Sequence, residues 1–114
     1  MENFKTYNKK ELVGKYIMYN DGSNSPRYIL MGKVESVNKE CVRLLPFIER
    51  RKEEYDFNVA SSCKSLHIDG ENMSGVKIID KEQFEKAMEI MLKLYNAQSD
   101  LGVWIRLLYA DKLN

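Results

Sequence analysis

The sequence has little of what catalytic centres and metal sites are built from. Among 114 residues there are two cysteines, Cys41 and Cys63, and a single histidine, His67. A structural zinc site takes four ligands, usually in short-spaced pairs, and these three residues have no such spacing. Cys63 and His67 are four residues apart, so an extended segment would separate them by about 13 Å, beyond the reach of a nucleophile and its base. We therefore expect no metal, no cofactor and no enzymatic activity.

Clustered glycines and long apolar runs are also missing. The six glycines stand singly, and none opens a helix after a strand, as phosphate-binding and dinucleotide-binding loops require. The longest apolar-rich stretch, residues 102–110, contains Arg106 and is too short to cross a bilayer. The N-terminus lacks the apolar core of a signal peptide. We therefore expect a cytoplasmic protein without membrane contact, in which both cysteines stay reduced.

The sequence also has no large excess of either positive or negative charge. The net charge is +1, so there is no overall electrostatic attraction to nucleic acid. Residues 1–52 carry 11 Lys and Arg against 6 Asp and Glu, whereas residues 53–114 carry 7 against 11. The basic half could face an anionic ligand or an acidic partner. Alternatively, both halves fold into one body whose surface mixes the two signs.

Branched and aromatic residues between turn signals predict about five short strands in the first 79 residues. The expected segments are 12–19, 27–37, 41–45 and 55–59, with shorter ones at 65–68 and 76–79. Gly32 predicts the bulge or bend that small barrels need in order to close. Pro46 is expected to end its strand, and the charge run 49–54 to form a solvated loop or short helix. We therefore predict an α+β fold built on a small, SH3-like or similar, partly open barrel.

The best-determined element is a helix that follows this barrel. Asp80 and Gln83 form a capping box, and Ile79 and Phe84 occupy the positions of a hydrophobic staple. Apolar residues then recur at helical spacing. This pattern predicts a helix from about residue 81 to residue 96.

The remaining residues, 97–114, allow two interpretations. Ser99 and Asp100 could cap a second helix, or residues 103–109 could form a buried strand. The Leu, Ala, Arg and Lys of the second half favour the helix. We therefore expect a single domain, residues 1–114, with the barrel at 1–79 and one or two helices at 80–114.

Lysines, arginines and tyrosines interleave in the basic half of the chain. Small barrels use aromatic rings beside cations to stack nucleotides or single-stranded nucleic acid. The alternative is that the tyrosines are ordinary wall residues and the lysines only solubilise the surface. The residues that we would assign to an anionic ligand are Lys15, Tyr16, Tyr19, Arg27 and Tyr28.

The last segment carries more apolar side chains than one helix face can hide. Its members are Trp104, Ile105, Leu107, Leu108 and Tyr109, with only Arg106 among them. A helix that is apolar on more than one side is either buried or part of an interface. We therefore predict that residues 101–113 form a homodimer interface or pack across the barrel mouth. The expected interface residues are Trp104, Ile105, Leu108 and Tyr109.

No motif in the sequence is specific enough to indicate a family. The first-ranked function is a non-catalytic binding module that acts through protein–protein interaction, as an inhibitor or adaptor. The alternative is a small barrel that binds a nucleotide or RNA through its basic, tyrosine-rich half, including a ligand sponge of the phage type.

Overall fold

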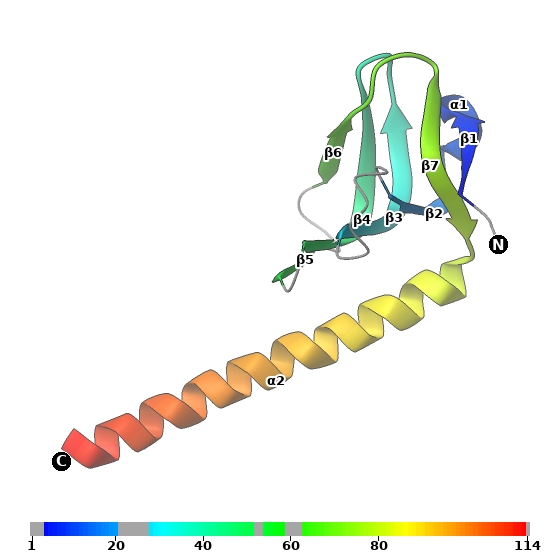
Figure 1. The fold of residues 1–114 in the computed structure, drawn as a ribbon. Helices are drawn as coiled ribbons and strands as arrows, with labels where there is room; N and C mark the ends of the chain where they lie inside the picture. Colours follow the sequence, from blue (N-terminus) through cyan, green and yellow to red (C-terminus); the bar gives the residue numbers. More distant parts are fainter. Residues whose placement is uncertain (1–3, 21–27, 52–53, 59–62, 114) are drawn as a thin grey trace. The chain divides into compact units, whose positions relative to one another are not determined.

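The computed structural model describes residues 4–20, 28–51, 54–58 and 63–113. The chain divides into two units, residues 1–84 and 85–114. The first unit holds the seven strands found among the described residues, and the second continues the long helix drawn from yellow to red in Figure 1. The prediction of a single domain stays a prediction. Among the described residues, no helix is long and apolar enough to cross a membrane.

The described strands pair in antiparallel fashion throughout. They are β1 (Lys5–Asn8), β2 (Tyr16–Tyr19), β3 (Tyr28–Val37), β4 (Cys41–Arg51), β5 (Glu54–Asn58), β6 (Lys64–His67) and β7 (Asn72–Ile79). Six of them follow one another in the order β1-β7-β2-β3-β4-β5, and β6 pairs with the first half of β4. The short helix α1 (Lys9–Leu12) follows β1, and α2 (Lys81–Leu113) follows β7.

The α+β class is confirmed, but the barrel is not. β1 and β5 stand at the two ends of the strand order, and no ladder among the described residues joins them. The sheet is therefore open. The expected first strand also starts too early, because Leu12 ends α1 and Gly14, at φ 84°, turns the chain before β2 begins. β1 was not predicted at all, since its four residues are mostly polar.

An irregularity near Pro46 changes the course of β4. Gly32 pairs with Phe47 and Val34 pairs with Leu44, so β4 has one more residue than β3 over this stretch. A Cβ on Gly32 would lie only 2.7 Å from the carbonyl oxygen of Pro46, which keeps this position for glycine. The sheet is irregular next to Gly32, as predicted, but the extra residue lies in β4. The predicted end of the strand at Pro46 is wrong, because a bulge accommodates proline within a sheet.

The core lies on one face of this sheet. Its cluster of buried side chains is Leu12, Ile17, Leu30, Val34, Val42, Leu44, Phe47, Met73 and Val76. Leu30 and Val34 come from one face of β3 and are fully buried, as the alternation along that strand predicts. Leu12 shows that α1 also contributes to the core, although it has only four residues.

The start of α2 follows the prediction, and its end does not. The Gln83 N–H donates to Asp80 Oδ1 at 2.7 Å, and the Asp80 N–H donates to Gln83 Oε1 at 3.0 Å, which is the expected capping box. The helix continues without a break to Leu113 (Figure 1). Residues 96–100 contain no glycine or proline to stop it, so Ser99 and Asp100 lie inside one helix. The strand alternative for residues 103–109 is wrong.

Candidate functional site

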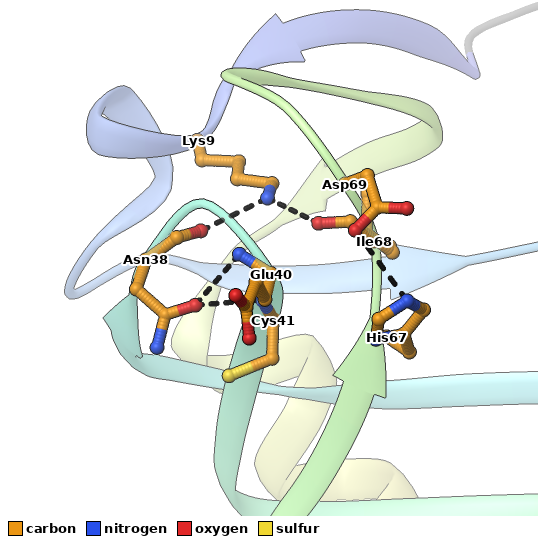
Figure 2. A network of polar contacts seen from close by, with 7 residues as sticks. All are labelled: Lys9, Asn38, Glu40, Cys41, His67, Ile68 and Asp69. Atoms are coloured by element: carbon orange, nitrogen blue, oxygen red, sulfur yellow. Dashed lines mark hydrogen bonds and ion pairs between the residues drawn. The ribbon is translucent and has the colours of Figure 1, made fainter.

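A buried lysine ties three distant segments together. Lys9, the first residue of α1, is 2% exposed. Its ammonium donates to the carbonyl oxygen of Asn38 at 3.0 Å and to that of Ile68 (Figure 2). Asn38 lies in the turn between β3 and β4, and Ile68 directly follows β6. A buried cation is tolerated only when it is hydrogen-bonded in this way. We call this meeting of Lys9 with residues 38–40 and 68–71 the Lys9 junction.

Backbone hydrogen bonds hold the same three segments in place. They run from Lys9 N to Glu71 O (2.8 Å), from Ile68 N to Glu40 O (3.0 Å) and from Gly70 N to Lys39 O (2.9 Å). Gly70 has φ 89°, a conformation that glycine adopts without strain. The junction is therefore fixed by its backbone as well as by the ammonium of Lys9.

Two asparagines shape the turns around the junction. Asn38 Oδ1 accepts hydrogen bonds from the N–H groups of Glu40 and Cys41, both at 2.8 Å (Figure 2). Asn8 Oδ1 accepts from the N–H of Lys10 at 2.9 Å and caps α1. Both carboxamide oxygens are thus engaged in local turns, so the carboxamide N–H groups are the ones suited to face a ligand.

A pocket of about 290 Å³ lies at the Lys9 junction. It is lined by Asn8, Lys9, Lys10, Val37, Asn38, Lys39, Gly70 and Glu71. Lys10 and Lys39 are exposed, and the three lysines outnumber the one carboxylate. Ammonium and carboxamide groups donate hydrogen bonds, so this lining suits a small anionic group.

His67 and Asp69 form a pair on the surface. His67 Nε2 lies 3.4 Å from Asp69 Oδ1, but these side chains are 77% and 78% exposed, where solvent screens an ion pair. Cys41 and Cys63 are free and partly buried. Within the described ranges, no group of three or more His, Cys, Asp or Glu side chains is placed to hold a metal ion.

No protein-family model, characterised protein or solved structure matches the chain. A function must therefore be inferred from the chain's own surfaces.

The tyrosines of β2 lie on opposite faces of the sheet. Tyr19 packs against the core cluster. Tyr16 instead places its ring 5.2 Å from that of Phe84, at an interplanar angle of 37°, and Lys33 Nζ lies 6.0 Å from the Tyr16 ring centre. Lys15 is exposed directly before β2. The structure thus separates Tyr16 from Tyr19.

The structure describes the other two predicted ligand residues only in part. Arg27 lies outside the described residues. Tyr28 begins β3, where its backbone pairs with Arg51. Their assignment to an anionic ligand stays a prediction.

Sequence reasoning missed a buried carboxylate. Glu49 was expected in a solvated loop, yet it lies in β4 with 4% exposure, and Lys64 Nζ is 3.2 Å from its Oε1. The extra residue of β4 beside Pro46 explains this, because Phe47 and Glu49 then face the same side as Leu44.

The predicted interface residues are exposed on α2. The exposed fractions are 56% for Trp104, 53% for Ile105 and 47% for Leu108. Tyr109 lies in the helix, and its side chain is outside the described part. From Leu92 to Leu108 every residue is exposed except Gly102, which is partly buried. Their assignment to an interface stays a prediction.

Proposed function

We propose that the chain is a non-catalytic binding module that acts through protein–protein contact, with the second half of α2 as its contact surface. The observation that carries the proposal is a run of half-exposed apolar side chains within eight residues. They are Leu101 (57%), Val103 (52%), Trp104 (56%), Ile105 (53%), Leu107 (55%) and Leu108 (47%). A contiguous exposed apolar patch of this kind is typical of an interaction site.

The energetics of such a patch favour association. Complete burial of one large apolar side chain contributes roughly 1.5–3 kcal/mol, so a few of these residues suffice to stabilise a complex. Trp104 is the expected anchor, because large aromatic side chains carry much of the binding energy at interfaces. We place this activity in the cytoplasm, where Cys41 and Cys63 stay reduced. A module of this size would act as an inhibitor or adaptor by occupying its partner's surface.

Trp104→Ala is expected to weaken partner binding at least roughly tenfold, because truncating an interface anchor commonly costs more than 1.4 kcal/mol. The tagged chain would be used to capture proteins from a lysate of the cells that produce it, and the captured protein would then be titrated against both variants. Ser99→Ala is the matched control, since Ser99 is an exposed polar residue of the same helix. Equal binding by the two variants would count against α2 as the contact surface.

The pocket at the Lys9 junction favours a second candidate function. Its three lysines and two carboxamides suit the phosphate of a nucleotide or the backbone of RNA. Lys10 and Lys39 would then bind the anion, with Lys9 contributing its charge from below the surface. This candidate differs from the β2 site predicted from the sequence, which rests on Lys15 and Arg27.

A pair of double variants separates the two anion sites. Titration with a nucleoside monophosphate and with a short single-stranded RNA is expected to show binding that Lys10→Glu with Lys39→Glu abolishes. Lys15→Glu with Arg27→Glu serves as the matched charge change elsewhere and should leave the affinity nearly unchanged. The opposite pattern would show that the anion binds at Lys15 and Arg27 instead. The absence of binding to either ligand would exclude this second function.

A further inference from the structure

Part of the apolar surface in the second half of α2 follows a seven-residue repeat, whereas Val103 and Leu107 lie outside it. Leu94, Leu101 and Leu108 are spaced by seven and take position d of the heptad abcdefg. The corresponding a positions are Met91, Gln98 and Ile105. Of these, only Ile105 is β-branched. A β-branched residue at a with leucine at d favours two strands over three or four in a parallel coiled coil.

The charged residues in the middle of α2 lie outside the a and d positions. Between residues 85 and 106 all of them occupy positions b, c or f: Glu85, Lys86, Glu89, Lys93, Asp100 and Arg106. On that outer face Lys93 Nζ lies 3.2 Å from Glu89 Oε1. This hydrogen bond, together with the positive charges of Lys86 and Lys93, lowers the pKa of Glu89. The charges between residues 85 and 106 are therefore all on the side that a paired helix leaves in water.

Positions e and g widen the apolar stripe. Tyr95 and Gly102 occupy e, and Ala97 and Trp104 occupy g. The large side chains at a, d, e and g from Leu94 onward are 37–58% exposed. At on the order of 100 Å² for each large side chain, the six of them present roughly 600 Å². That is close to the ~800 Å² that each partner buries in a standard interface.

Gln98 indicates the direction of pairing. It is the polar residue at a between Met91 and Ile105. In a parallel pair in register, each Gln98 would face the Gln98 of the other helix, and the two carboxamides can hydrogen-bond. In an antiparallel pair position a faces position d, so Gln98 would be buried against leucine with its polar atoms unpaired.

We propose that α2 pairs with α2 of a second copy of this chain, parallel and in register, through residues 94–108. The inference rests on the proposed function, because it names the partner of the same surface. The occupant is a second copy rather than an unrelated protein because a second copy in register places Gln98 opposite Gln98 as well as leucine opposite leucine.

Disulfide cross-linking tests the register. Leu94→Cys and Leu108→Cys would each be introduced into the full chain carrying Cys41→Ser and Cys63→Ser. On mild oxidation both variants are expected to give at least roughly tenfold more covalent dimer than Ser99→Cys, whose position b points away from the partner. An antiparallel pair cannot bring both positions to their own counterparts, so dimer from one variant alone would overturn the parallel register.

Sedimentation of the same full chain tests the association itself. The wild type is expected to sediment as an oligomer at tens of micromolar, and Ile105→Asp should convert it to monomer, whereas Asp100→Asn at position c should not. Circular dichroism would confirm that the variants remain folded. A wild-type monomer with the emission of a buried Trp104 would mean that the chain itself covers the patch, and it would overturn the proposal.

The two proposals fail in different ways. If the wild type is monomeric but captures a different protein in a Trp104-dependent manner, self-pairing is wrong and the protein-binding function stands. If it neither associates nor captures any protein through Trp104, both are wrong.

Discussion

Lys9→Met is expected to lower the free energy of unfolding by about 2 kcal/mol, because a buried acceptor left without its donor costs about 1–3 kcal/mol and the two acceptors here are partly buried. Methionine replaces the buried part of the lysine stem with a side chain of similar shape. The carbonyl oxygens of Asn38 and Ile68 would lose the ammonium that now donates to them. The loss should loosen the attachment of α1 to both turns at once.

Lys10→Met is the matched control for this prediction. Lys10 is the neighbouring residue of the same short helix, but it is exposed, so its replacement should change stability by no more than about 0.5 kcal/mol. The measurement is the urea midpoint and slope of both variants. Similar midpoints for the two would show that the Lys9 ammonium does not tie the segments together.

The burial of Lys9 could not be predicted from the sequence. Local sequence gives Lys9 and Lys10 the same polar surroundings, and both would be expected in solvent. What distinguishes them is that residues 29 and 59 positions further along place two carbonyl oxygens around one ammonium. The pocket is formed where the same three segments, far apart in the sequence, come together. This explains why no local sequence motif predicts it.

The sheet was predictable where alternation is regular and failed where a bulge interrupts it. The segment 27–37 was expected as a strand, and two-residue periodicity along it puts Leu30 and Val34 on the same, buried side of the sheet. Glu49 was misplaced, because the strand was expected to end at Pro46, whereas β4 continues through it and its extra residue turns Glu49 to the core side. A single sequence does not reveal how a strand and its partner accommodate such a residue.

The helix was predictable at its start and in its apolar composition. The capping box depends on residues three apart, so Asp80 and Gln83 could be assigned from local sequence alone. The end near Asn96 was placed too early, because Ser99 and Asp100 can be read as a cap although an uninterrupted helix also tolerates them. Reading the helix as continuous is what makes the heptad spacing of its leucines meaningful.

Gly75→Ala is expected to lower the free energy of unfolding by about 4 kcal/mol, the largest effect that we predict for a single methyl group. Gly75 has φ 76° in the middle of β7. It lies where Lys5 pairs with Val76 and Tyr7 with Met73, so β7 has one more residue than β1 there. An L-residue held in this left-handed conformation costs about 1–2 kcal/mol by itself.

The remainder of the effect comes from the neighbouring backbone. A Cβ on Gly75 would overlap the carbonyl oxygen of Asn20, and Asn20 N now donates to Gly75 O at 3.0 Å. Relieving the overlap must separate the two segments and lose that hydrogen bond, at about 1 kcal/mol for the bond alone. Gly14→Ala is the matched control, because Gly14 has φ 84° with nothing within 4 Å of the added methyl group. Gly14→Ala should therefore show the conformational cost alone, and equal urea midpoints for the two variants would mean that the approach of Asn20 to β7 contributes nothing to stability.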